Sequence, residues 1–368
     1  MPDMDLILNP LIERIRAAAA SGTPLRIRGG GSKDFYGERL EGELLETRPL
    51  AGIISYEPTE LVVTAYGGTP LAELEALLAG RGQCLPFEPP HFGGGATVGG
   101  MAAAGLSGPA RASVGAVRDY VLGMTLVNGK GELLTFGGQV MKNVAGYDVS
   151  RLVTGTLGTL GLIVEVSLKV LPVAPREATL KFEMSQEEAL QRLAEWGGKP
   201  LPLNASCWVD DGGAKTLYLR LRGAVAAVES ACRTLGGERL DNAQVAPDWA
   251  LCRDQRLPWF AERGDRDLWR LSVAQAAPVL DLPEAPLVEW HGALRWVRAE
   301  PGAAAALRQA ATRAGGHATL FALAGAGATT VERRFTPLTA PLDRIHRELK
   351  QQFDPKGIFN PHRMHTDF

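Results

Sequence analysis

The chain begins with apolar residues at helical spacing over positions 9–20 and then changes to short apolar runs of strand length. These runs are expected to form strands, and they lie at residues 25–28, 52–66 (two strands split at Glu57-Pro58), 121–127, 132–138 and 161–170. A helix is expected between them, with Thr69 as its cap and Pro70 at its first position. The runs on either side of Asn128-Gly129 should form a hairpin, because both residues of that step tolerate positive φ.

Prolines in the segment LPVAP, residues 171–175, indicate a boundary, because proline cannot donate to a strand ladder. Strands and helices alternate beyond it, with strands expected at 178–184, 204–210, 216–222 and around Trp269, Val288 and Trp296, and helices at 186–196, 224–235 and 342–353. Ser185 and Glu188 have the spacing of a capping box for the first of these helices. Hairpins with helices between them predict an antiparallel sheet covered on one face, an α+β domain.

Composition excludes several classes of protein. The 368 residues suffice for roughly two domains of about 150 residues each. Lys and Arg number 39 against 41 Asp and Glu, without a long basic block, which argues against nucleic acid or an anionic membrane as the main partner. The acidic N-terminus does not resemble a signal peptide, and the longest weakly polar stretch, 318–331, is too short for a membrane span. We therefore expect a cytoplasmic protein.

The cysteines indicate neither a zinc site nor a redox dithiol, because no two of them have a paired spacing: Cys84, Cys207, Cys232 and Cys252. Glycines, in contrast, gather in three clusters, at 29–31, at 93–95 with 99–100, and at 155, 158 and 161. Because glycine has no side chain and permits positive φ, backbone N–H groups in such loops can converge on an anion, and a diphosphate is the obvious candidate.

The second cluster adds a helix start to this picture. Thr97 is expected to cap a short alanine-rich helix whose first amides point at the anion. The alternative for each glycine cluster is a tight turn without a ligand. Neither the Rossmann spacing G-x-G-x-x-G nor a Walker A loop fits these segments, so a dinucleotide here would be held by a different arrangement.

Four segments together resemble a known family. They are RGGGS at 28–32, PPHFGGGATVGGMAAAGLSGPARASVGAVRDYVLGMTLV at 89–127, KNVAGYDVSRLVTGTLGTLGLIVEVSLKV at 142–170 and FDPKGIFNP at 353–361. They resemble the FAD-binding domain of the vanillyl-alcohol oxidase and p-cresol methylhydroxylase (PCMH) superfamily, and KNVAGYD with the short chain is most similar to FAD-binding subunits of glycolate oxidases. The resemblance implies an α+β fold: a PCMH-type FAD-binding domain of two subdomains at 1–175, a smaller cap domain with an antiparallel sheet at 176–335, and a C-terminal segment, 336–368, that packs back on the FAD domain.

The resemblance also implies which residues bind FAD. The diphosphate would be held from one side by Gly29, Gly30, Gly31 and Ser32 and from the other by Thr97, Gly99 and Gly100. Further along the cofactor would lie Gly105 and Gly115 at the flavin and ribityl chain, Ile163 at the adenine half through its backbone, Asn360 at the flavin edge and Arg111 nearby. Ser32 and Lys33 stand where covalently flavinylated relatives often carry a histidine, so we expect non-covalent FAD.

No catalytic base can be assigned. Oxidation of a hydroxy acid requires a base near the carbinol proton and a flavin that takes the hydride. Larger relatives that oxidise D-2-hydroxy acids carry HxxGDGNxH, whereas the corresponding stretch here is GGHATLFALAG, with His317 alone. His291 and His317 are candidate bases, and the alternative for each is a histidine with backbone partners or a surface position. His362, which replaces a turn glycine of many relatives, and His365 share a helical spacing, but no metal site is expected.

The leading hypothesis is an FAD-binding subunit of a glycolate oxidase, which oxidises glycolate to glyoxylate. The resemblance implies two partners, a larger FAD-containing subunit and an iron–sulfur subunit that passes the electrons on, with membrane attachment only through such partners. Without a cysteine cluster in this chain, any iron–sulfur centre belongs to another chain. Two alternatives stay open: a self-sufficient flavoprotein D-2-hydroxy acid dehydrogenase, and a scaffold that has lost the flavin.

Overall fold

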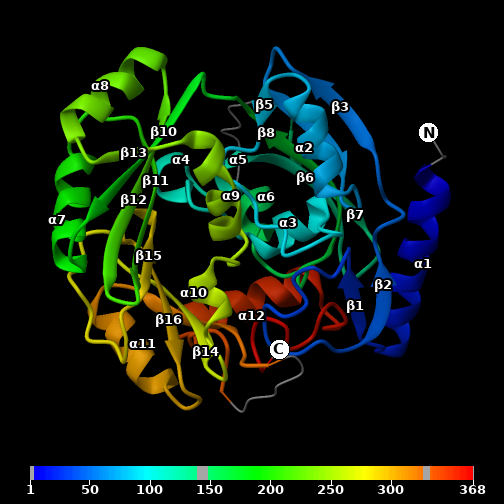
Figure 1. Cartoon of the computed structure of the whole chain (residues 1–368). Coiled ribbons are helices and arrows are strands. Elements are labelled where there is room, and N and C mark those ends of the chain that lie inside the picture. The colour runs from blue at the N-terminus through cyan, green and yellow to red at the C-terminus, as the bar shows by residue number, and fades with distance from the viewer. Residues whose placement is uncertain (1–3, 139–147, 326–331, 368) are drawn as a thin grey trace. The chain divides into compact units, whose positions relative to one another are not determined.

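The structure is a computed structural model that describes residues 4–138, 148–325 and 332–367 (Figure 1). The motif KNVAGYD lies outside the described residues except for its last residue, Asp148. The chain divides into two compact units: unit 1 comprises Met1–Leu106, Ala116–Pro172 and Pro337–Phe368, and unit 2 comprises Ser107–Gly115 and Val173–Thr336. The sequence did not predict that the short segment Ser107–Gly115 groups with the second unit.

Unit 1 contains a five-stranded antiparallel sheet and two separate strand pairs. The order in the sheet is β3 (Ile53–Glu57), β4 (Val62–Tyr66), β8 (Leu162–Lys169), β6 (Val121–Val127) and β7 (Leu133–Gly137). The pairs are β1 (Leu25–Arg28) with β2 (Glu43–Glu46), which run parallel, and β5 (Gln83–Cys84) with β9 (Leu171–Pro172). The expected hairpin at Asn128-Gly129 is confirmed, since it joins β6 to β7.

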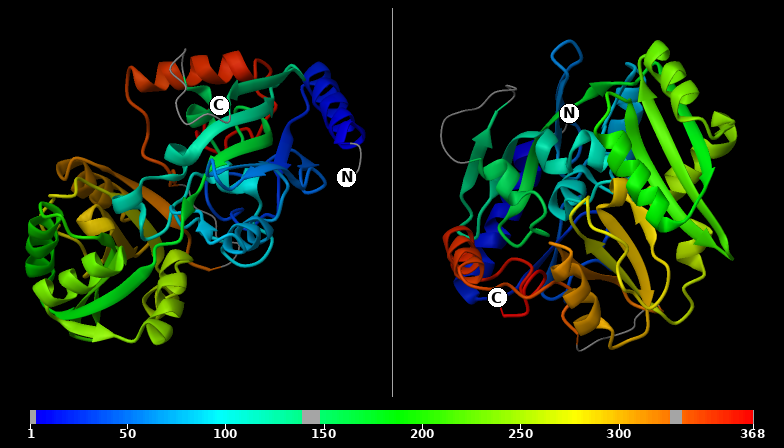
Figure 2. Two further views of the ribbon diagram at one scale, coloured as in Figure 1. Left: turned by 90° about the horizontal axis from the view of Figure 1, so that it is seen from above. Right: turned by 90° about the vertical axis from the view of Figure 1, so that its left-hand side faces the viewer.

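The helices of unit 1 are α1 (Met4–Ser21), α2 (Leu71–Ala79), α3 (Val98–Ala104), α5 (Val117–Tyr120), α6 (Val149–Val153) and α12 (Leu342–Phe353). Helix α1 begins five residues earlier than expected, and α12 has the expected bounds. Thr69 does not cap α2, because its hydroxyl exchanges two hydrogen bonds of 3.0 Å with the backbone N–H and C=O of Gly52. Phe353, at the end of α12, packs on Phe136 of β7 with ring centroids 6.3 Å apart, which fastens the helix beside the sheet (Figure 2).

Unit 2 is built on one eight-stranded antiparallel sheet. Its order is β13 (Glu238–Leu240), β10 (Arg176–Glu183), β12 (Ala214–Gly223), β11 (Leu203–Asp211), β15 (Leu287–Glu289), β16 (Leu294–Ala299), β14 (Asp267–Ser272) and β17 (His317–Ala322). Its helices are α4 (Arg111–Val114), α7 (Gln186–Gly197), α8 (Val225–Leu235), α9 (Asn242–Arg253), α10 (Pro258–Ala261), α11 (Ala304–Arg313) and a 3-10 turn at Trp290–Gly292. The predicted antiparallel sheet is thus confirmed.

Helices cover both faces of this sheet, so the expectation of one covered face is wrong. Helices α7 and α8 lie beside β10, β12 and β13 (Figure 1), and their buried Leu193 and Val228 share a core with the strands. On the opposite face, the indole N–H of Trp249 in α9 donates to Thr179 Oγ1 at 3.0 Å, and the Arg220 guanidinium lies 4.8 Å from the centre of that indole ring. Throughout the parts of the chain that the structure describes, no helix combines the length and apolar character of a membrane span.

Candidate functional site

Two loops of unit 1 approach each other where the first two glycine clusters occur. A Cβ atom added at Gly30 would lie 1.4 Å from the carbonyl oxygen of Gly95, and one added at Gly29 would lie 2.4 Å from Thr97 Oγ1. Both distances are far below a van der Waals contact, so the facing loop excludes a side chain at both positions. The two clusters therefore form one site, in which the Gly95 backbone excludes a Cβ at Gly30 and the Thr97 side chain excludes one at Gly29.

A cavity opens between these loops. Seven of the expected cofactor residues line it: Gly29, Gly30, Gly31, Ser32, Thr97, Gly100 and Asn360. Within the described residues, the backbone N–H groups of Gly30, Gly31 and Ser32 form no hydrogen bond with another group of the chain. These residues are half-buried, and amides that line a cavity without an internal partner are available to donate to a bound anion. This loop is therefore chemically suited to a diphosphate.

The amides at the start of α3 have a different role from the expected one. The N–H of Gly99 donates to Gly67 O at 2.7 Å, and the N–H of Gly100 donates to Thr97 Oγ1 at 3.1 Å. The N–H of Val98 also donates to a backbone carbonyl, at 2.9 Å. The expectation that these amides point at the ligand is therefore wrong, since the protein already satisfies them. Gly99 is small for a packing reason, because a Cβ there would lie 2.8 Å from the Gly67 carbonyl oxygen.

Besides Gly99, two other expected residues of unit 1 lie outside the lining of this cavity. Gly105 ends α3 with φ of 62°, and a Cβ added there would lie 2.8 Å from the Cα of Gly155, so glycine is needed for backbone packing. Ile163 lies in β8 with its side chain in the core of unit 1. The flavin and adenine contacts assigned to them stay predictions.

The C-terminal tail reaches the cavity through Asn360. Its side-chain oxygen accepts a 2.7 Å hydrogen bond from the N–H of Ile27, and its side-chain nitrogen donates to Leu157 O at 2.6 Å. Because both ends of the amide are held by the backbone, Asn360 ties the tail to β1 and to the third glycine cluster. Its contact with the flavin edge stays a prediction.

Arg363 also lines the cavity, and the sequence analysis missed it. Its guanidinium donates to the carbonyls of Asp34 at 2.9 Å and Glu38 at 3.2 Å, so it holds the segment that follows the first glycine cluster. Arg28 reinforces the same segment through a 2.7 Å ion pair with Asp34. Nothing in the sequence separates this buried arginine from the many exposed ones, because its partners are backbone carbonyls more than 300 residues away.

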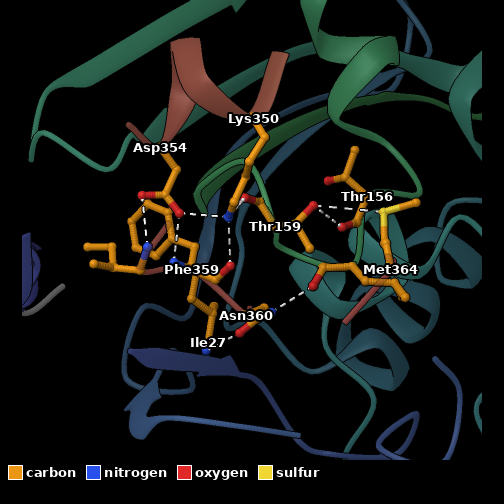
Figure 3. A network of polar contacts seen from close by, with 10 residues as sticks. Ile27, Thr156, Thr159, Lys350, Asp354, Phe359, Asn360 and Met364 are labelled. Carbon is orange, nitrogen blue, oxygen red and sulfur yellow. Dashed lines mark hydrogen bonds and ion pairs between the residues drawn. The ribbon is translucent and has the colours of Figure 1, made fainter. Parts of the chain in front are cut away.

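A buried ion pair anchors the tail (Figure 3). The Lys350 amine donates to Asp354 at 2.7 Å, to Thr159 O at 2.8 Å and to Phe359 O at 2.9 Å. The Asp354 carboxylate in turn accepts the N–H groups of Ile358 and Phe359 at 3.1 and 2.7 Å. Burial lowers the pKa of the Lys350 amine, and the Asp354 charge opposes this shift. The network fixes the turn that leads to Asn360.

Arg111 and Gly115 belong to unit 2, where the segment 107–115 is attached at the 3-10 turn. The Trp290 indole N–H donates to Gly108 O at 3.0 Å, and the Arg111 guanidinium lies 4.5 Å from the centre of the same ring. Gly115 ends α4 with φ of 103°, a conformation that favours glycine. The proximity of Arg111 and Gly115 to a cofactor stays a prediction.

His291, a candidate base, has partners on both ring nitrogens. Its Nε2 lies 2.9 Å from Ser113 Oγ and its Nδ1 lies 3.1 Å from Ser206 Oγ. Burial lowers the pKa of His291 to about 4, so the ring is neutral at pH 7. The ring is buried against serine hydroxyls rather than paired with backbone groups or exposed at the surface, so the role of His291 as a base stays a prediction. The other candidate, His317, has its pKa lowered by burial and by Arg270.

Cys207 and Cys252 meet in unit 2 although the sequence gave no sign of it. They line one cavity of about 240 Å³ on the α9 side of the sheet. The Cys252 thiol donates to Glu289 Oε1 at 3.1 Å. Its contact with Cys207, its burial and the nearby Glu289 charge raise the pKa of the Cys252 thiol, which makes it unreactive as a nucleophile.

Known proteins resemble this chain in sequence and in fold. Residues 9–137 match the family model described as an FAD binding domain. The chain is 46% identical over 359 residues to the glycolate oxidase subunit GlcE of Escherichia coli (strain K12), covering 97% of both chains. It is 30% identical over 159 residues to the glycolate oxidase subunit GlcD of Bacillus subtilis (strain 168), covering 43% of this chain and 34% of that one. A solved structure of alkyldihydroxyacetonephosphate synthase has the same fold, with a TM-score of 0.64 at 16% identity over 95% of this chain and 74% of that one.

Proposed function

The chain belongs to the family of the glycolate oxidase subunit GlcE, and from this premise we propose that it is the FAD-binding subunit of a glycolate oxidase that converts glycolate to glyoxylate. The observation that carries the proposal is the cavity between the two glycine loops, where the amides of Gly30, Gly31 and Ser32 have no partner within the described chain. A diphosphate supplies the acceptors that these three donors lack.

The residues present fit FAD bound without a covalent link. The amides of the first loop would hold the diphosphate, while Gly95 and Thr97 close the cavity from the facing loop. When bound, FAD supplies the group that accepts a hydride from the alcohol carbon. As far as the structure describes the lining of this cavity, it contains no histidine, cysteine or tyrosine, which supports dissociable binding.

The chain's own residues bind and orient the cofactor in this proposal. Arg363 and Asn360 keep the first loop and β1 in place, so the amides are positioned before the ligand arrives. We propose that the chemical base lies outside this cavity, because no histidine is among the described residues that line it. We therefore assign the hydroxy-acid chemistry to a larger FAD-containing subunit, which the similarity to GlcD supports.

An iron–sulfur subunit is the third proposed component. Iron–sulfur clusters are held by several cysteine thiolates gathered at one place. Cys207 and Cys252 line one cavity of unit 2, whereas Cys84 belongs to the other unit. Electrons that leave the flavin would therefore pass to a cluster on another chain.

The test is to express the chain alone and together with its two proposed partners. FAD should be released on denaturation, the isolated chain should turn over glycolate negligibly, and the assembled complex should be active. Flavin that stays attached to the denatured chain would refute non-covalent binding. Rapid oxidation of glycolate or D-lactate by the isolated chain would favour a self-sufficient enzyme, and a chain that gains no flavin absorbance with added FAD would refute the proposal.

A further inference from the structure

Two histidines that are distant in the sequence meet in unit 1. His346 Nδ1 in α12 lies 3.2 Å from His365 Nε2 in the tail, across a separation of 19 residues. Their ring centroids are 5.1 Å apart and the rings are almost perpendicular, at 83°. His365 shares a helical spacing with His362 in the sequence, but His362 Nδ1 instead lies 2.9 Å from Thr366 O.

The distance between the two nitrogens suits a shared metal ion. Imidazole nitrogens bind zinc at about 2.0–2.1 Å, so two nitrogens 3.2 Å apart subtend about 100° at a common ion. This angle is close to the roughly 109° of tetrahedral coordination. A small rotation of each ring would direct both lone pairs at that ion.

Both histidines line a cavity of about 90 Å³ that also contains a thioether. Met364 is part of the lining, together with Thr156 and Thr159. Figure 3 shows Met364 beside the two threonines, and the Thr159 hydroxyl contacts its sulfur at 3.8 Å. Lys350 lines the same cavity, but its amine is occupied by Asp354 and two carbonyls, so the ion pair brings little net charge to the cavity.

We propose that His346, His365 and Met364 form a binding site for one transition-metal cation of borderline or soft character, with copper the foremost candidate. Imidazole suits copper, nickel and zinc, a thioether adds a preference for copper, and Cu²⁺ has the highest affinity of the divalent series. In the proposed site the Met364 thioether, which lines the same cavity, is the third protein ligand and water completes the shell.

Metal bound here would hold α12 to the tail residues that follow Asn360 and Arg363. The site is thus separate from the glycine-lined cavity, and its occupation is measurable without FAD.

The test is equilibrium dialysis of the full chain, freed of FAD, against Cu²⁺, Ni²⁺ and Zn²⁺ at pH 7.5, with metal content measured per chain. One Cu²⁺ should bind per chain, and its electron paramagnetic resonance spectrum should show coupling to two nitrogens. His346→Gln and His365→Gln should each weaken binding by at least the roughly tenfold loss that changes around metal ligands cause. Glutamine keeps a hydrogen bond across the pair, so both variants should unfold at the wild-type temperature.

His362→Asn is the matched control, because asparagine tolerates the positive φ of 57° at that position and removes only the imidazole. It should bind Cu²⁺ as the wild type does, while Met364→Leu should weaken the binding of Cu²⁺ more than that of Zn²⁺. The proposal is overturned if the wild-type chain binds less than one equivalent, or if His362→Asn loses as much affinity as the two glutamine variants.

Discussion

Replacement of Gly30 by alanine tests the cavity between the two glycine loops at the position where the loops lie closest together. The new Cβ would lie 1.4 Å from the carbonyl oxygen of Gly95 and 2.4 Å from its carbonyl carbon. Both neighbours are backbone atoms, so no side chain can move aside and the two loops must separate. The loops that line the diphosphate cavity would then lose their spacing.

The expected size of the effect follows from the amide donors. A hydrogen bond to a charged group contributes about 1.5–3 kcal/mol. If the displaced loop loses two of its three bonds to the diphosphate, FAD binding weakens by about 3–6 kcal/mol, a rise in Kd of roughly 10² to 10⁴-fold. The purified variant should therefore contain almost no FAD.

Gly94→Ala is the matched control, because Gly94 lies in the facing loop and nothing lies within 4 Å of an added Cβ. Flavin absorbance of the purified chains and titration with FAD measure both variants, and circular dichroism checks that each is folded. Gly94→Ala should bind as the wild type does. A folded Gly30→Ala chain that keeps one FAD with unchanged Kd would refute the reasoning.

Three further predictions concern the supports of the site and the stability of each unit. Asn360→Ala leaves the Ile27 N–H and the Leu157 carbonyl without partners, so hydrogen exchange in β1 should show a loss of about 2–4 kcal/mol; unchanged protection of β1 would contradict this. Lys350→Met leaves the Asp354 carboxylate buried without its cation, which should cost about 3–5 kcal/mol, and a loss under about 1 kcal/mol would argue against the network. The depressed pKa of His291, about 4 against 6.5, means that its contribution to stability is complete above pH 6.5 and is lost as the pH falls toward 4, by about 3 kcal/mol. Tryptophan fluorescence follows this loss in unit 2, which contains all seven tryptophans, and His291→Gln should flatten this part of the pH profile.

Local patterns predicted many of the regular elements but not all, since β2, α11 and β17 were not expected. Helix α12 has the expected bounds, and Ser185 Oγ accepts the N–H of Glu188 at the start of α7, as the capping sequence indicated. Helix α9 was missed, because Pro247 and charged residues interrupt its apolar stripe. It forms because Trp249 packs on the sheet, a contact that the local sequence does not reveal.

Glycine content predicted that two loops approach each other but not what approaches each glycine. At Gly30 the close neighbour is the facing loop, whose approach leaves room for an anion beside free amides. At Gly99 the close neighbour is the Gly67 backbone, which takes the amide itself. Both positions require glycine, so the sequence alone cannot show whether a glycine is there for contact with a ligand or for packing against another backbone segment. The contacts of Arg363 and the pairing of His346 with His365 could not be predicted for a related reason, because the partners are distant in the chain.

The central claim is that the first glycine loop holds the FAD diphosphate through its backbone. A crystal structure of the purified chain with FAD tests this most directly. The account predicts diphosphate oxygens within about 2.7–3.2 Å of the backbone nitrogens of Gly30, Gly31 and Ser32. Electron density that places the diphosphate away from residues 29–32, with those three amides facing only water, would contradict it.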